Sequence, residues 1–177
     1  DRDGAKPLGN ARGEIEFKNL TFAYPDSEIP SLKNVSFKIE AGENVGIVGR
    51  TGSGKTTVAD LILRTYNVPD GTVFIDGNDV NDVTIESVRK NAAYVPQDNF
   101  LFSDTIENNI AFASDEVSFD AVVRSAKLAD VNGNIAEFRD GYKTVLGERG
   151  VTVSGGQKQR ISIARAMMKN APVLILD

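Results

Sequence analysis

The stretch of sequence that decides the fold is Gly49-Arg50-Thr51-Gly52-Ser53-Gly54-Lys55-Thr56. Its outer glycines are five positions apart, and a lysine and a threonine follow the second one. Glycine permits positive φ angles and a close approach of the backbone, so the amides of such a loop can point inward at an anion. The lysine places a charge on the β- and γ-phosphates, and the threonine hydroxyl is a ligand for Mg²⁺. The stretch therefore predicts a phosphate-binding loop, or P-loop.

The residues on either side of the P-loop fit this interpretation. The apolar run at 45–48 is bounded by glycines and predicts a buried parallel strand. After the loop, Val58, Leu61, Ile62 and Thr65 recur at helical spacing and predict a helix of about three turns. The N-terminus of that helix would add its positive dipole end to the phosphate site.

The rest of the chain indicates an α/β protein whose β-rich opening precedes a helical part. Residues 1–13 show no periodicity and predict a linker or tail. Apolar alternation and short apolar runs predict strands at 15–17, 20–24, 35–39, 73–75, 92–95 and 173–177. Helical spacing and capping residues predict helices at 84–91, 105–111, 119–129, 134–138 and 157–168.

Composition narrows the class of protein. The 177 residues are 41% hydrophobic and carry a net charge of −5, which argues against a dedicated nucleic-acid binder. The absence of cysteine excludes disulfides and thiolate metal sites, and the absence of histidine removes the commonest general base. No apolar run approaches the roughly 18 to 20 residues that span a bilayer, so we expect the 177-residue chain to be soluble.

Two further motifs lie near the C-terminus. In Val153-Ser154-Gly155-Gly156-Gln157 a serine and two glycines precede an amphipathic helix, an arrangement that forms a second phosphate site at the helix N-terminus. Within one domain this site should lie far from the P-loop. The apolar strand at 173–176 ends in Asp177, whose carboxylate would hold Mg²⁺ through water beside Thr56.

Together these motifs closely resemble the ATP-binding cassette (ABC) family, over about residues 14–177. The family's signature loop reads Leu-Ser-Gly-Gly-Gln, and valine replaces the leucine here. The resemblance implies a P-loop NTPase (RecA-like) core, an N-terminal antiparallel β lobe and an inserted helical subdomain, with the C-terminal strands missing. It divides the chain into a linker from a preceding membrane domain (1–13), the β lobe and P-loop core (14–97), the helical subdomain with the signature loop (98–156), and the signature helix with the Walker B strand (157–177).

The resemblance also implies roles for individual residues. Tyr24 matches the aromatic that stacks on adenine, and Gln97 matches the Q-loop, which senses the γ-phosphate and Mg²⁺ and touches the transmembrane partner. Glu148 and Arg149 lie in an exporter-type segment that contacts coupling helices of the membrane domains, and the 102–110 segment is also exporter-like. The nucleotide-binding residues would be Tyr24, Gly49, Arg50, Thr51, Gly52, Ser53, Gly54, Lys55, Thr56 and Thr57. The metal ligands would be Thr56, Gln97 and Asp177, and the signature residues acting in trans would be Ser154, Gly155, Gly156 and Gln157.

The function that the resemblance implies is that of the nucleotide-binding domain of an ABC exporter. Its ligands would be ATP and Mg²⁺, and its partners a second nucleotide-binding domain, identical or different, and the transmembrane domains of the same transporter. We expect no nucleic-acid partner and a place at the cytoplasmic face of the cell membrane.

The family's catalytic set is not complete in this sequence. The glutamate that normally follows the Walker B aspartate and the switch histidine are not in the 177 residues, and Gln97 would have only a supporting role. We therefore expect ATP binding with poor hydrolysis. A non-hydrolysing module, such as the degenerate half of a heterodimer, is the alternative. A soluble ABC ATPase fits the exporter-like segments less well, and a GTPase would need an Asn-Lys-x-Asp motif that the sequence lacks.

Overall fold

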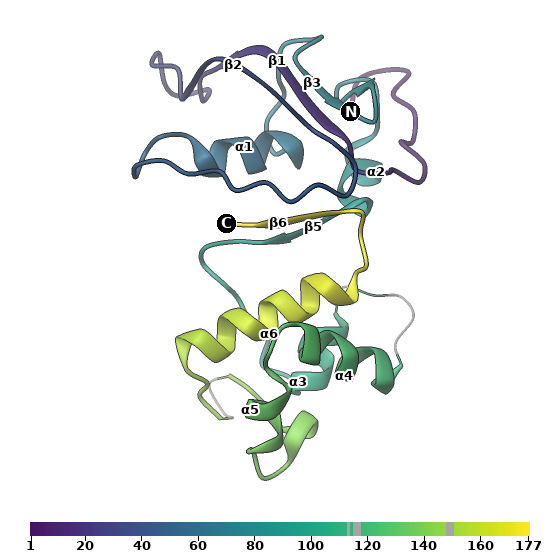
Figure 1. The fold of residues 1–177 in the computed structure, drawn as a ribbon, viewed down its shortest axis with the longest axis vertical. Helices are drawn as coiled ribbons and strands as arrows, with labels where there is room; N and C mark the ends of the chain where they lie inside the picture. The colour runs from purple at the N-terminus through teal and green to yellow at the C-terminus, as the bar shows by residue number, and fades with distance from the viewer. Residues whose placement is uncertain (113, 115–117, 148–150) are drawn as a thin grey trace. The chain divides into compact units, whose positions relative to one another are not determined.

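A computed structural model describes residues 1–112, 114, 118–147 and 151–177. The chain divides into two compact units (Figure 1). The first, Asp1–Ala92 with Asp177, is called the P-loop unit, and the second, Ala93–Leu176, is called the signature unit. The four-part division expected from the sequence stays a prediction.

The P-loop unit contains an antiparallel sheet with the strand order β2-β1-β3-β4. Its strands are β1 (Ile15–Phe22), β2 (Leu32–Ile39), β3 (Val73–Ile75) and β4 (Asn78–Asp79). In the register Phe17 faces Phe37, and the two rings stack with centroids 4.5 Å apart. Phe17 and Leu20 are almost completely buried, which makes β1 the centre of the apolar core of this sheet.

The first two predicted strands form one strand. Alternation breaks between Phe17 and Leu20, so the sequence pattern suggests an interruption there. In the structure β1 continues through a register shift between these residues, and Asn19 takes a left-handed conformation with φ 46°. A β-bulge of this kind displaces one residue and changes the face on which the following side chains lie, which a strict period of two cannot anticipate.

The prediction of a strand at 45–48 is wrong, because the structure has no strand there. Among the described residues, 45–48 make no backbone ladder with β2 or any other strand of their unit. Val48 is 96% exposed, and the segment borders a hollow of about 380 Å³ that is also lined by apolar residues of β2. A parallel strand exists only through hydrogen bonds to neighbouring backbones, and an apolar run does not by itself supply those neighbours.

Two helices complete the P-loop unit. Helix α1 (Lys55–Ile62) starts at Lys55, within the P-loop stretch, and is shorter than predicted, because Arg64 takes a left-handed conformation with φ 50°. Helix α2 (Ile85–Lys90) begins as predicted, with the Thr84 hydroxyl accepting a hydrogen bond from the Ser87 amide.

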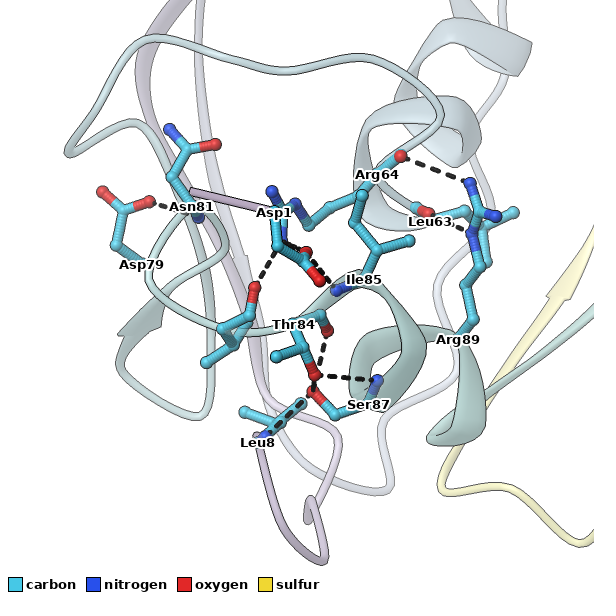
Figure 2. Close-up of polar contacts among 11 residues, drawn as sticks. Asp1, Leu8, Leu63, Arg64, Asp79, Asn81, Thr84, Ile85, Ser87 and Arg89 are labelled. Carbon is cyan, nitrogen blue, oxygen red and sulfur yellow. Dashed lines mark hydrogen bonds and ion pairs between the residues drawn. The ribbon is translucent and has the colours of Figure 1, made fainter. Parts of the chain in front are cut away.

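The N-terminal residues make polar contacts with the rest of the P-loop unit (Figure 2). The Asp1 carboxylate accepts from the Ile85 amide at 2.7 Å and pairs with the buried guanidinium of Arg64 at 3.3 Å. The Leu8 amide donates to the Ser87 hydroxyl at 2.9 Å. These contacts place the segment beside α2, although its sequence has no periodic pattern.

The signature unit is built around one long helix. Helix α6 (Gly155–Met168) packs on α3 (Ile106–Ala111) and α4 (Phe119–Leu128), and its core includes Ile161 and Ala164. The remaining elements are α5 (Asn132–Ala136), a 3₁₀ turn at Gly141–Lys143, and the paired strands β5 (Ala92–Val95) and β6 (Val173–Leu176). The predicted helices are confirmed, and α5 and α6 each begin two residues earlier than expected.

Within the described residues, none of the helices combines the length and the apolar character needed to cross a bilayer.

Candidate nucleotide-binding site

The P-loop has the backbone conformation that its glycines predict. Gly52 and Gly54 have φ angles of 79° and 86°, in the left-handed region. At Gly54 a Cβ atom would also lie 2.8 Å from the Ser31 carbonyl oxygen and 2.7 Å from Leu32 Cδ2. The glycine at position 54 is therefore required both by its dihedral angle and by the close approach of the chain before β2.

Lys55 closes over the loop. Its ammonium group donates to the carbonyl oxygens of Gly49 at 3.0 Å and Arg50 at 2.9 Å. An ammonium group has three donors, so this position holds the charge above the loop and leaves a donor for a further acceptor. A phosphate in the loop would find the charge already at its rim.

The two metal candidates in the P-loop unit lie together. Thr56 and Asp177 are 121 residues apart in the sequence, and their Oγ1 and Oδ1 atoms are 3.2 Å apart. A hydroxyl and a carboxylate oxygen suit Mg²⁺, which keeps several waters and shares phosphate oxygens in place of a complete protein cage. The pair therefore fits a magnesium ion that arrives with a nucleotide.

The Tyr24 hydroxyl is hydrogen-bonded to side chains of helix α1. It lies 2.8 Å from Thr57 Oγ1 and 3.4 Å from Asp60 Oδ2. The ring makes edge-to-face contacts with Phe22 and Tyr66, at centroid distances of 5.2 and 5.1 Å. The sequence identified Tyr24 as a candidate for base stacking but gave no sign of these contacts.

The signature loop forms a capping box at the start of α6. The Ser154 hydroxyl accepts from the Gln157 amide at 3.2 Å, and the Gln157 side chain accepts from the Ser154 amide at 2.9 Å. In this arrangement the Ser154 oxygen acts as acceptor, so its own proton remains available to a further acceptor.

Gly155 and Gly156 follow this cap in open surroundings. A Cβ at Gly155 would meet nothing within 4 Å, and one at Gly156 would meet only the Arg160 guanidinium at 4.0 Å. Both residues are helical, so no left-handed dihedral angle requires a glycine. The described fold therefore does not explain these two glycines.

The other predicted residues lie in the signature unit. Gln97 follows β5 and is exposed. Glu148 and Arg149 lie outside the described residues, but Gly147 before them has φ 108° and approaches Ser103 so closely that a Cβ would lie 2.3 Å from its hydroxyl oxygen. The Leu146 amide also donates to the Asp104 carbonyl at 2.9 Å. The structure thus places Gly147, the described residue of one exporter-like segment, against Ser103 of the other.

One residue in this region was missed by the sequence reasoning. Arg165 of α6 is half-buried and donates to the backbone and side-chain oxygens of Asn109 at 2.7 and 3.0 Å and to the Phe100 carbonyl at 2.9 Å. Its guanidinium also lies over the Phe102 ring at 5.2 Å. Burial lowers the pKa of Arg165, although the group remains charged. A single arginine on an amphipathic helix gives no sequence signal that it will hydrogen-bond to a distant part of the chain.

Comparison with known proteins decides the family. A family model described as "ABC transporter" matches residues 32–177. The chain belongs to the ABC transporter family. Within it, the chain corresponds to the nucleotide-binding domain of exporter type, with the P-loop NTPase fold expected from the sequence.

Individual relatives of this ABC transporter domain are closely similar. It is 44% identical over 176 residues to the ATP-dependent lipid A-core flippase of Salmonella typhimurium, and 47% identical to that of Photorhabdus laumondii. Both matches cover 99% of this chain and 30% of the relative, so the chain spans less than a third of these relatives. A solved bacterial Atm1-family ABC exporter with ATP bound matches the whole chain with a TM-score of 0.92 and 43% identity, over 31% of that exporter's chain.

Proposed function

We propose that this chain binds ATP together with Mg²⁺ and serves as the ATPase domain of an ABC exporter, coupling ATP binding and hydrolysis to export of a solute. The observation that carries the proposal is the P-loop with Lys55 at its rim and the Thr56–Asp177 pair, 3.2 Å apart, beside it. The similarity to an exporter that was solved with ATP bound supports it.

The residues of the P-loop would divide the work of binding. The loop amides and the dipole of α1 would hold phosphate oxygens, and Lys55 would exchange its carbonyl acceptors for them. Thr56 and Asp177 would hold Mg²⁺, which on binding neutralises charge that develops on the phosphates. Tyr24 would contact the base.

The open surroundings of Gly155 and Gly156 support use of the signature loop in trans. Because no described contact within the chain requires glycine at either position, a close approach from outside it is a sufficient reason for both. A γ-phosphate held by the P-loop of a second nucleotide-binding domain would be such a group, and the free donor of Ser154 would face it. The partners proposed are therefore a second domain of this kind and the transmembrane domains of the transporter, at the cytoplasmic face of the membrane. Gln97, Glu148 and Arg149 are the proposed contacts with the membrane domains.

Two experiments test this proposal. Calorimetric titration of the 177-residue chain with Mg-ATP should show binding that Lys55→Ala abolishes and Lys33→Ala, a change at an exposed lysine of β2, leaves intact. A longer protein containing the membrane domains, purified in lipid, should hydrolyse ATP with the same dependence on Lys55. ATP hydrolysis by the longer protein that survives Lys55→Ala would disprove the proposed role of the P-loop. For the 177-residue chain alone we expect negligible ATP hydrolysis.

A further inference from the structure

A line of polar contacts runs from Tyr24 to the middle of α1. Tyr24 Oη lies 2.8 Å from Thr57 Oγ1 and 3.4 Å from Asp60 Oδ2. An ionised carboxylate only accepts, and a tyrosine hydroxyl has one proton to give. If that proton points to Asp60, the short contact must be a hydrogen bond from Thr57 to the Tyr24 oxygen. With Asp60 ionised, Thr57 therefore donates to Tyr24, and Tyr24 donates to Asp60.

The two groups that hold the Tyr24 hydroxyl are themselves fixed. Thr57 is 4% exposed and belongs to α1. Asp60 lies on the same helix and also accepts a side-chain hydrogen bond from Thr65. Burial raises the pKa of Asp60, while the hydrogen bonds from Tyr24 and Thr65 oppose the rise and favour the charged acceptor.

The Tyr24 ring is held on other sides by aromatic side chains. The rings of Phe22 and Tyr66 meet it at interplanar angles of 78° and 83°. With its hydroxyl attached to α1 and two edge-to-face contacts, the ring has a fixed plane before any nucleotide arrives. Helix α1 also begins at Lys55, so Lys55 and the two residues that hold the Tyr24 hydroxyl belong to one helix.

We propose that Asp60 and Thr57 are positioning residues for the nucleotide base: they orient the Tyr24 ring so that its face receives a planar base, and they thereby set the affinity for the base separately from the affinity for the phosphates. This inference rests on the proposed ATP binding. It adds that the start of α1 binds the phosphates, while Thr57 and Asp60 further along the helix orient the ring that contacts the base. Stacking on a ring that is already oriented loses less conformational freedom on binding than stacking on a mobile one.

The test compares two ligands, Mg-ATP and Mg-tripolyphosphate, by calorimetric titration of the 177-residue chain. Tripolyphosphate has the phosphates but no base, so the ratio of the two dissociation constants isolates the contribution of the base. Asp60→Ala should weaken ATP roughly three- to tenfold relative to tripolyphosphate, the effect expected for one net hydrogen bond. Asp60→Asn is the matched control, because it removes the same charge but keeps an oxygen acceptor, and its ratio should stay within about twofold of the original.

A double-mutant cycle identifies the path of the effect. Tyr24→Phe keeps the ring but removes the hydroxyl. This variant should weaken ATP binding relative to tripolyphosphate binding about as much as Asp60→Ala does. Because Asp60 acts through that hydroxyl, Asp60→Ala should have no further effect in the Tyr24→Phe background.

The outcomes separate this inference from the proposed function. An unchanged ratio in Asp60→Ala, a loss that is equal for both ligands, or additive losses in the double variant would each overturn the inference and leave ATP binding intact. Tighter ATP binding by Tyr24→Phe would overturn it too, since the hydroxyl contact would then oppose binding. Failure of the unaltered chain to bind either ligand would overturn the proposed function and this inference together.

Discussion

Replacing Gly54 by alanine should destabilise the P-loop unit strongly, although the change adds one methyl group. Two costs combine. The left-handed conformation at φ 86° costs an alanine about 1–2 kcal/mol. The added Cβ would lie 2.8 Å from the Ser31 carbonyl oxygen and 2.7 Å from Leu32 Cδ2, and forced overpacking of this kind costs about 1–3 kcal/mol. The sum is about 3 kcal/mol, because the flexible end of Leu32 can move but the Ser31 backbone cannot move without disturbing the start of β2.

The measurement is urea unfolding followed by far-ultraviolet circular dichroism. For a slope of about 2 kcal/mol per molar urea, a loss of 3 kcal/mol lowers the midpoint of the affected transition by about 1.5 M. ATP binding should be lost as well, because any relief of the contact moves the amides that precede Lys55.

Gly155→Ala is the matched control, because it makes the same chemical change in the other glycine motif. Position 155 is helical and a Cβ there meets nothing within 4 Å, so alanine should be neutral or stabilising by up to about 1 kcal/mol. In a longer protein this second variant should nevertheless impair ATP turnover, since the added methyl group would obstruct a partner's phosphate. Equal unfolding midpoints for the two variants would refute the assignment of separate reasons to the two glycines.

Two further predictions concern contacts away from the P-loop. Arg165→Ala should lower the stability of the signature unit by about 2–3 kcal/mol in urea unfolding, because it removes the donors to Asn109 and Phe100; Arg165→Lys should not restore it, since lysine lacks the planar fork. Hydrogen bonds from Asn81 and then Arg2 hold the pKa of Asp70 below its ordinary value, so the stability they add is present above about pH 4 and is lost as the pH falls through the lowered pKa. The protection of amides in the N-terminal segment, taken relative to the intrinsic exchange rate at each pH, should therefore fall in acid, and Asp70→Asn should remove most of that pH dependence.

Helix starts could be read from the sequence because capping is local. Thr84, Thr105, Ser118 and Ser154 each accept a hydrogen bond from the amide three residues on, as their residue types favour. The P-loop and the signature loop were found for the same reason: each is a short continuous stretch in which glycines and hydroxyls have fixed spacing.

The features that the sequence did not reveal depend on distant partners. The run at 45–48 has the composition of a buried strand, but the strand depends on neighbouring backbones that composition does not specify. The support of Tyr24 joins residues 33 and 36 positions apart. The three hydrogen bonds of Arg165 reach back 56 and 65 positions. Contacts of this kind follow from the topology and have no counterpart in a local pattern.

The position of β2 at one end of the sheet has a consequence for self-association. An edge strand offers unpaired amides and carbonyls to any other extended chain, and a second copy of this protein is the chain most often nearby. Two features of β2 oppose such pairing. Lys33 and Lys38 place charged side chains along the edge strand, and Asn34, in a left-handed conformation at φ 51°, bends the strand out of a flat register. The strand whose Phe37 stacks on Phe17 thus also carries features that disfavour pairing at the edge of the sheet.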